Sequence, residues 1–303
     1  MVATKKEILP KKGGTKNKTT AKKNIVKKVI PKKTSSRLKK IIKSEINKEE
    51  LVVKDYKSWG SGPYLSVIIP AFNEAKRIPL TLIDVDRILK DMDFDYEIVV
   101  VDDGSSDNTV LVVKKFADVI PYLRVIENLE NHGKGYVVRQ GMIEAKGEIR
   151  LFMDADNSTT VDQFLLMKNY FDKGASVVIG SRALKESELS PPQAWYKQIA
   201  GKMGNLFIQI VALPGIWDTQ CGFKAFNRRA AMDIFERAEI NRWAFDVEAL
   251  LLAKKLGYEI EMIPVYWVND IYSHVKLSSY IQVLFETVKI ALRLRKGVKD
   301  SLG

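Results

Sequence analysis

Short apolar runs alternate with longer amphipathic stretches in the middle of the chain. The runs are continuous, as in strands buried on both faces, and the stretches repeat apolar residues at helical spacing. The strand-like runs are residues 65–70, 96–101, 122–126, 149–153 and 175–180. The helix-like stretches are residues 75–92, 107–117 and 134–145, and Ser105 or Ser106 is the expected N-cap of the second. The alternation predicts an α/β fold, in which a mainly parallel sheet is flanked by helices.

The pattern changes after residue 190. Helices are expected at residues 193–211, 245–256 and 277–295, and β structure at residues 221–227 and 258–268. In the last helix, one stripe is apolar: Tyr280, Ile281, Leu284, Phe285, Val288 and Leu292. Basic residues crowd its end: Arg293, Arg295, Lys296 and Lys299. The stripe predicts either packing on the helix's own domain or contact with a membrane surface.

Charge divides the chain into a basic N-terminal segment and a slightly acidic remainder. The net charge is +12 over 303 residues, but residues 1–48 alone hold 17 Lys and Arg against 2 acidic residues. We expect a disordered Lys-rich tail over residues 1–50, because such a segment buries too little apolar surface to fold. A linker follows over residues 51–64. The tail has three interpretations: a solubilising segment, attraction to anionic lipid, or non-specific contact with nucleic acid.

Cysteine usage and hydropathy bear on where the protein acts. The single cysteine, Cys221, excludes an intramolecular disulfide and fits a reducing compartment. The N-terminus lacks the apolar core of a secretory signal, and the longest uncharged run, residues 203–217, is short for a membrane span. We therefore expect a soluble or peripheral protein of the cytoplasm.

Two carboxylates follow the expected strand at residues 149–153. Asp154 and Asp156 come directly after this apolar run, in a loop where an open α/β sheet binds its ligands. Like charges at such close spacing repel, and a hard divalent cation removes the conflict. Mg²⁺ is held by one or two carboxylates and completes its coordination with water and phosphate oxygens. The pair predicts a metal site, although Asp-x-Asp by itself also occurs in ordinary solvated loops.

Three further loops are expected at the same edge of the sheet. The first loop begins at Pro70, the proline that ends the run at residues 65–70, and also carries Asn73 and Glu74. The loop after residues 96–101 carries Asp102, Asp103 and Gly104, and an aspartate there can accept a hydrogen bond from a nucleobase N–H. The third, Asn131-His132-Gly133-Lys134-Gly135, opens a helix and offers backbone N–H groups, a helix dipole and the lysine Lys134 to an anion.

Taken together, these motifs resemble those of the family 2 glycosyltransferases with the GT-A (Rossmann-like) fold. The matching stretches are SVIIPAFNEAKRI, VVVDDGSSDNT, NHGKGYVVRQGM, LFMDADNSTT, GSR and DTQCGFKAF. The sequence is most similar to dolichyl-phosphate β-glucosyltransferases, and next to dolichyl-phosphate mannose synthases, over about residues 64–296. The resemblance implies an inverting transfer of one sugar from a nucleotide-sugar donor to a polyprenyl-phosphate lipid acceptor, with Mg²⁺ or Mn²⁺. It also implies a peripheral protein on the inner, cytoplasmic face of a membrane.

The resemblance assigns expected roles to individual residues. Asp154 and Asp156 match the metal-binding pair, and Asp103, with Asp102 beside it, matches the position that contacts the base. Pro70, Asn73 and Glu74 match the nucleotide pocket. Arg182 matches a basic residue near the acceptor phosphate, and Lys197 lies where mannose synthases place a second one. Those synthases have a glutamine two residues after the second metal aspartate, where this chain has Ser158, so the third protein ligand is left open.

The chemistry of the acceptor bears on the catalytic residues. A phosphate monoester is anionic near neutral pH, so Arg182 and Lys197 are expected to orient it, by bidentate and point-charge contacts respectively. Asp246 and Glu248 are the candidates if a general base is required, and an ion-paired helix start is their other interpretation. The expected domain, residues 65–303, divides into a nucleotide-binding half (65–160), an acceptor half (161–276) and a C-terminal helix (277–303).

Two alternative functions remain at this point. Within the same enzyme class, the donor is GDP-mannose or another UDP-sugar in place of UDP-glucose. In a different class, the chain is a nucleic-acid-binding protein led by its basic tail.

Overall fold

The computed structural model describes residues 62–191, 195–269 and 277–295. The predictions for the basic tail and for most of the linker therefore lie outside the described residues. The described chain contains a sheet in the order β3-β2-β1-β4-β7-β5-β8 and a small parallel pair, β6-β9. The strands of the main sheet are β1 (Leu65–Ala71), β2 (Tyr96–Asp102), β3 (Leu123–Glu127), β4 (Ile149–Met153), β5 (Val177–Ser181), β7 (Phe223–Asn227) and β8 (Ile260–Pro264). The pair consists of β6 (Glu188–Ser190) and β9 (Tyr266–Val268).

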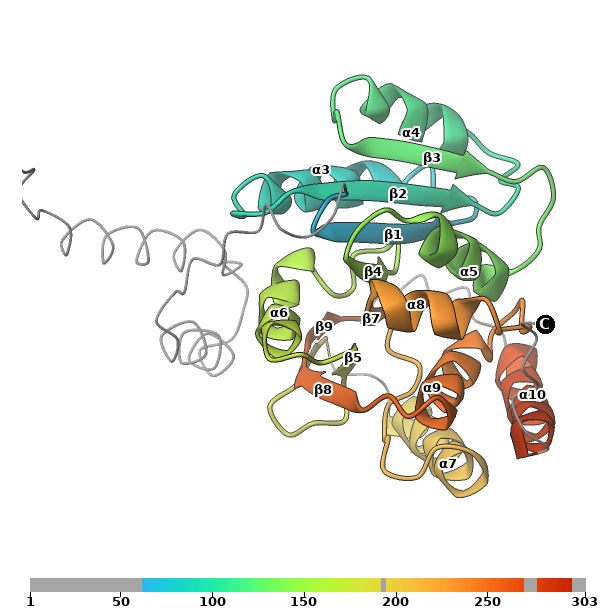
Figure 1. The fold of residues 1–303 in the computed structure, drawn as a ribbon. Helices are drawn as coiled ribbons and strands as arrows, with labels where there is room; N and C mark the ends of the chain where they lie inside the picture. The colour runs from blue at the N-terminus through green and yellow to red at the C-terminus, as the bar shows by residue number, and fades with distance from the viewer. Residues whose placement is uncertain (1–61, 192–194, 270–276, 296–303) are drawn as a thin grey trace, which may run out of the picture.

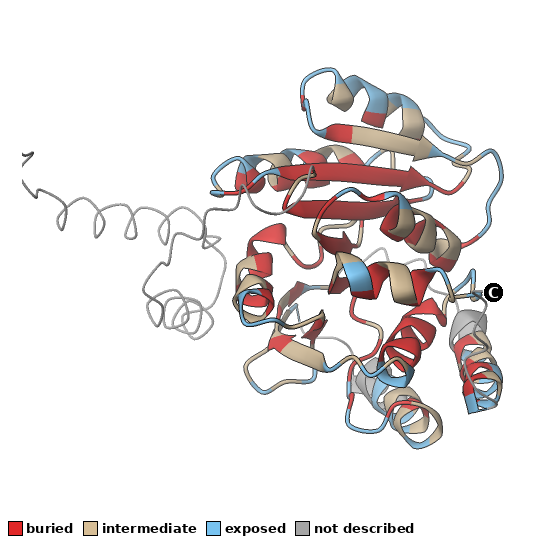
Figure 2. Cartoon of the chain, viewed as in Figure 1, coloured by how far each residue is buried: buried red, intermediate tan, exposed pale blue. Residues whose placement is uncertain are grey.

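The main sheet is parallel except at one strand. β7 runs antiparallel to both of its neighbours, β4 and β5, and places Lys224 beside Phe152 and Ile179. The central strands β1, β2, β4 and β5 are buried throughout (Figure 2), which agrees with their continuous apolar sequences. The predicted mainly parallel sheet is confirmed, and its strands come from both of the expected halves of the domain.

Helices cover both faces of the sheet (Figure 1). Their bounds are α3 (Ile78–Leu89), α4 (Thr109–Ala117), α5 (Lys134–Glu144), the 3-10 turn η2 (Val161–Gln163), α6 (Phe164–Asp172), α7 (Trp195–Val211), α8 (Arg228–Phe235), α9 (Phe245–Lys255) and α10 (Leu277–Arg295). Apolar residues of α3, α4 and α6 pack in one core, and those of α5, α7, α8, α9 and α10 pack in the other.

Two local expectations are corrected by the structure. The N-cap of α4 is Asn108, not Ser105 or Ser106, and it makes no side-chain capping bond. The carboxylate of Asp107 instead accepts the backbone N–H of Thr109 at 2.9 Å. The sequence prediction also contained neither α6 nor α8, which are short helices.

Most of the stripe predicted on the last helix faces outward in the described part of α10, and Leu284 is half-buried. Ile281, Phe285, Val288 and Leu292 are exposed, whereas the face that packs on the domain consists of Val283, Thr287, Ile290, Ala291 and Leu294. The side chain of Tyr280 lies outside the described residues. Both faces of the helix are therefore apolar, and the more regular stripe is the one left open.

Candidate active site

The loops that follow β1, β2 and β4 meet at the carboxyl edge of the sheet. Asp103 donates its backbone N–H to the carbonyl oxygen of Ala71 at 2.9 Å, which joins the first two loops. Asn73, held at a φ of 57°, accepts the backbone N–H of Ser106 at 2.9 Å. The hydroxyl of Thr81, on α3, donates to the carbonyl oxygen of Ala155 at 2.6 Å and ties in the third loop. The predicted convergence of these loops is thus present.

The fourth loop, residues 131–135, binds an anion, but that anion belongs to the chain itself. The carboxylate of Asp103 accepts the backbone N–H groups of His132 at 2.7 Å and Gly133 at 3.0 Å, and the side-chain amide of Asn131 at 2.9 Å. Burial raises the pKa of the Asp103 carboxyl, and the donated N–H groups offset this only in part. Gly133 has a φ of 101°, and a Cβ there would lie 2.5 Å from the carbonyl oxygen of Asn241. The loop therefore fixes Asp103 in place.

Asp102 is the more open acceptor of this acidic pair. It is buried at the end of β2, and one carboxylate oxygen accepts the N–H of Ser105 at 2.9 Å. Its other oxygen, Oδ1, has no hydrogen-bond partner among the described residues. A buried carboxylate oxygen without a donor is costly unless a ligand supplies one. The neighbouring Glu74 is committed to Arg77, whose Nε donates to it at 2.6 Å.

Asp154 and Asp156 lie in the loop directly after β4, as predicted. Burial, and secondarily the charge of Asp154, raise the pKa of Asp156, so the two carboxylates act on each other. Asp156 accepts the backbone N–H of Ser158 at 2.9 Å. Gly222 lies against Asp154, where a Cβ would fall 1.9 Å from a carboxylate oxygen. Only glycine at position 222 leaves room for that carboxylate.

Two lysine–aspartate ion pairs adjoin these carboxylates. The Lys134 ammonium contacts Asp154 at 2.5 Å, and the buried Lys224 contacts Asp246 at 2.5 Å. Burial would lower the pKa of Lys134, but the charges of Asp154 and Asp246 outweigh it and raise that pKa. Burial raises the pKa of Asp246, and Lys224 only partly opposes this. Lys134 therefore lies between the Asp154–Asp156 pair and the buried ion pair of Lys224 and Asp246.

Arg182, at the end of β5, is bound to an aspartate that the sequence analysis did not single out. Its Nε and Nη2 each donate to Asp218 at 2.8 Å, and its backbone N–H donates at 2.7 Å. The guanidinium also lies over the ring of Trp267, with 4.6 Å from Cζ to the ring centroid. Burial would lower the pKa of Arg182, but the charge and hydrogen bonds of Asp218 outweigh it and raise that pKa, with a smaller contribution from Asp154.

Comparison with known proteins supports the interpretation of these features. Residues 66–235 match the family model described as glycosyl transferase family 2. The chain belongs to glycosyltransferase family 2. A dolichyl-phosphate β-glucosyltransferase of Dictyostelium discoideum is 37% identical over 248 residues, covering 78% of this chain and 76% of that protein. The human enzyme of the same name is 34% identical over 247 residues, covering 77% and 76%. The predicted family resemblance is confirmed.

Solved structures show the same fold at low sequence identity. Mannosyl-3-phosphoglycerate synthase from Rubrobacter xylanophilus has a TM-score of 0.58 at 17% identity, covering 80% of this chain and 76% of its own. Glucosyl-3-phosphoglycerate synthase from Mycobacterium tuberculosis, in complex with Mn²⁺, UDP and product, has a TM-score of 0.56 at 17% identity, covering 80% and 82%. The expected GT-A fold is confirmed for this glycosyltransferase.

The acidic pair of this family 2 glycosyltransferase suits a small, hard cation. Within the cluster, four carboxylates (Asp154, Asp156, Asp218, Asp246) face three cations (Lys134, Arg182, Lys224), which leaves a net negative charge beside Asp156. No group of three or more His, Cys, Asp or Glu residues able to hold a metal occurs in the described ranges. A cation there would take two protein carboxylates and fill its other positions with water or phosphate, as Mg²⁺ commonly does.

One predicted residue, Glu248, is bound outside this cluster, and the side chain of another, Lys197, is not described. Glu248 is fully buried, accepts the backbone N–H groups of Glu239 and Ile240 at 3.0 and 2.8 Å, and pairs with Arg293. These contacts favour its structural interpretation over that of a general base. Lys197 lies near the start of α7, and its side chain is outside the described residues.

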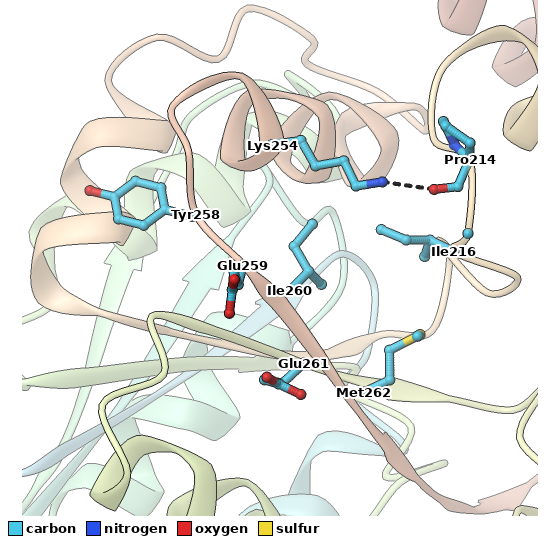
Figure 3. Close-up of a pocket in the computed structure, with 9 residues that line it drawn as sticks. Pro214, Ile216, Lys254, Tyr258, Glu259, Ile260, Glu261 and Met262 are labelled. Atoms are coloured by element: carbon cyan, nitrogen blue, oxygen red, sulfur yellow. Dashed lines mark hydrogen bonds between the residues drawn. The ribbon is translucent and has the colours of Figure 1, made fainter.

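The residues that sequence reasoning missed are Asp218 and Lys224. Both belong to the stretch DTQCGFK, which was used only as a family motif. A cavity of about 420 Å³ lies elsewhere, lined by residues of the loop after α7, the end of α9 and β8. Figure 3 shows Lys254 reaching across one side of it to Pro214. None of the predicted site residues lines that cavity, so we do not place the active site there.

Proposed function

We propose that this glycosyltransferase moves a glucosyl unit from UDP-glucose to the phosphate of a polyprenyl, dolichyl-type lipid, with inversion at the anomeric carbon. The observation that carries this proposal is the acidic pair Asp154–Asp156 at the carboxyl edge of the sheet, flanked by Lys134 and Arg182. The names of relatives at 33–37% identity support the choice of glucose and of a lipid phosphate.

The nucleoside would lie against the loops after β1 and β2. Asp102 keeps a buried carboxylate oxygen with no donor, and this oxygen can accept the N3–H of a uracil. Asp103 supports this arrangement indirectly, because it accepts hydrogen bonds from residues 131–133 and holds them in place. Asn73, Glu74 and Gly104 shape the surrounding loops, and Asn73 does so by accepting N–H groups from the second loop. Pro70 lies within β1, beside Val101 of β2, and not in the loop expected from the sequence.

The diphosphate would lie toward Asp154 and Asp156. We propose that these two residues hold Mg²⁺ or Mn²⁺, as the Mn²⁺ complex of the mycobacterial neighbour suggests for this fold. When bound, the cation supplies Lewis-acid stabilisation of the departing UDP. The Lys134 ammonium, beside Asp154 at 2.5 Å, adds a second positive charge at that position.

The acceptor phosphate needs positioning more than deprotonation. One of its oxygens attacks the anomeric carbon, the bond from that carbon to the UDP oxygen breaks, and UDP leaves as an anion. Arg182 keeps three N–H donors beyond the two that bind Asp218, and these can orient the phosphate. Lys197 is the proposed second contact. Asp246 is engaged by Lys224, so we assign it to the placement of Lys134 instead of to proton transfer.

The lipid acceptor implies contact with a membrane surface. No helix in residues 62–191, 195–269 or 277–295 has the length and apolar character to span a bilayer. Two contacting helices, α7 and α10, do expose an apolar surface, which we call the α7/α10 face: Met203, Leu206, Ile210, Ile281, Phe285, Val288 and Leu292. Ile210 and Phe285 are 75% and 73% exposed, and the cations Lys202, Lys289 and Arg295 are exposed on the same helices.

We propose that the α7/α10 face rests on the cytoplasmic surface of a membrane. Apolar side chains bordered by basic ones suit the boundary between headgroups and acyl chains. In Figure 1 the arrowheads of β2 and β3 point toward the side of the molecule where α10 lies, so the carboxyl ends of these strands and α10 are on the same side. A lipid phosphate could then reach Arg182 without leaving the bilayer surface.

A donor screen tests the proposal. Purified full-length enzyme is given one radiolabelled sugar nucleotide at a time, with Mn²⁺ and a short polyprenyl phosphate. We expect label in the lipid product from UDP-glucose and a loss of that label when EDTA is added. Transfer from GDP-mannose or from another UDP-sugar, with none from UDP-glucose, would contradict the proposed donor.

A further inference from the structure

Asp218 lies in the loop before β7 and is buried, with 2% of its surface exposed. It accepts three hydrogen bonds from one residue, Arg182: from the backbone N–H at 2.7 Å and from Nε and Nη2 at 2.8 Å each. Paired bonds of this kind fix the plane of a guanidinium as well as its position. Trp267, 4.6 Å from Cζ, packs against that plane.

The same short segment also contacts the acidic pair. The carbonyl oxygen of Gly222, four residues after Asp218, accepts the backbone N–H of Asp154 at 3.2 Å. The Asp154 carboxylate occupies the space where a Cβ at position 222 would lie. Cys221, between the two, is fully buried and lies against Gly180 next to the end of β5. Residues 218–222 therefore hold Arg182 at one end and Asp154 at the other.

We propose that Asp218 is a positioning residue, which fixes the Arg182 guanidinium so that its Nη1 edge is presented to the acceptor phosphate. This inference rests on the proposed function. The Nε–Nη2 edge of Arg182 is occupied by Asp218, so a phosphate oxygen pair can be bound only by the remaining end of the fork, formed by Nη1 and the second Nη2 proton.

The negative charge of Asp218 distinguishes orientation of the Arg182 guanidinium from electrostatic attraction of the acceptor phosphate. The carboxylate of Asp218 offsets the charge of Arg182, so the pair attracts a phosphate less than a free arginine would. Asp218→Asn removes that offset and also releases the guanidinium. We expect the KM for polyprenyl phosphate to stay within twofold of wild type or to fall, while kcat falls at least tenfold, because the phosphate is still bound but is no longer oriented.

The experiment uses the full-length enzyme with saturating UDP-glucose and varied short polyprenyl phosphate. Initial rates, the Kd for UDP and the melting temperature are measured for wild type, Asp218→Asn, Arg182→Ala and the double variant. The matched control is Asp172→Asn, which removes the exposed ion pair with Lys168 on α6 and should leave kcat and KM unchanged. If Asp218 acts through Arg182, the double variant is no slower than Arg182→Ala alone, and UDP binding is unchanged throughout.

Several results would overturn the inference. These are an unchanged kcat in Asp218→Asn, a further tenfold loss on the Arg182→Ala background, or a loss of UDP affinity that parallels a loss of melting temperature. If Asp218→Asn does not fold, Asp218→Glu keeps the charge and shifts the guanidinium, and a wild-type kcat in that variant contradicts the inference. A wild-type enzyme that transfers nothing to polyprenyl phosphate would instead contradict the proposed function.

Discussion

Asp154, Lys134, Asp246 and Lys224, in that order, form a chain of alternating charges in which each side chain restrains the next. The consequence for chemistry is that Asp246, although close to the acidic pair, has a buried lysine 2.5 Å away and is a poor candidate for accepting a proton. Charge compensation of this kind is needed because an unpaired buried ion is strongly destabilising. With Asp246 committed to Lys224, Asp156 and the Lys134-paired Asp154 remain the carboxylates proposed to hold the cation.

Asp162 offers a prediction about pH. It is buried, its Oδ1 has no partner among the described residues, and burial raises its pKa to about 7. An unfolded carboxyl loses its proton near pH 4, so between about pH 4 and pH 7 the folded state holds the extra proton. This group therefore makes the free energy of unfolding fall as the pH rises from 4 to 7, with no further change above.

The Asp162→Asn variant isolates that effect. Because the amide does not titrate, the variant should gain stability relative to wild type as the pH rises from 5 to 8, by urea unfolding at each pH. A constant difference between the two proteins across that range would show that Asp162 does not titrate in the folded state.

At the residue scale, the sequence located the carboxylates but not their partners. Asp154 and Asp156 could be predicted because they follow directly after an apolar strand. The bond from Arg182 to Asp218 joins residues 36 positions apart, and no local pattern marks it. In the same way, the loop of residues 131–135 was predicted to bind an anion, and only the folded chain shows that its backbone N–H groups bind Asp103.

At the scale of elements, periodicity predicted strands and long helices well, and their directions and faces less well. The apolar run at residues 221–227 predicts a strand, but its antiparallel direction depends on the long excursion through α7. In α10, both sides are apolar, so the pattern could not tell the packed face, which contains Val283 and Ile290, from the open one, which contains Phe285. The bounds of α10 could be predicted from the sequence because its apolar positions recur at helical spacing.

Glu248 fixes α10 to the domain through Arg293, and this contact leads to a prediction. Removing the charge in Glu248→Gln leaves the half-buried Arg293 with a weakened, fully buried partner, and we expect a loss of about 3 kcal/mol in the free energy of unfolding. Glu239, which pairs with the same arginine but is exposed, is the matched control. Glu239→Gln should cost less than about 1 kcal/mol. Equal losses in urea unfolding would contradict a special role for Glu248.

At the scale of the whole molecule, the order of the sheet is what assembles the site. β1, β2 and β4 are neighbours, so loops from residue 71 to residue 160 meet at one edge, and β7 inserts beside β4 to bring in Gly222 and Lys224. The loops could be grouped from the sequence because each follows a predicted strand, whereas the roles of Gly222 and Lys224 emerge only from the folded chain.

The α7/α10 face leads to a prediction for the whole enzyme. Ile210→Asp combined with Phe285→Asp should reduce binding to neutral phosphatidylcholine vesicles at high salt at least fivefold, because apolar burial is lost there and the attraction of the basic tail is screened. Val119→Asp combined with Leu129→Asp changes two exposed apolar residues elsewhere and serves as the control. In vesicle sedimentation, equal binding by both double variants would contradict the proposed face.

The proposed reaction requires a cation bound by Asp154 and Asp156, and a Mn²⁺ binding isotherm in the presence of UDP measures that binding. We predict that wild type binds Mn²⁺ at a single site and that Asp156→Asn binds it at least thirtyfold more weakly, with an unchanged melting temperature in the absence of metal. Mn²⁺ affinity in Asp156→Asn equal to that of wild type would contradict the proposed metal site.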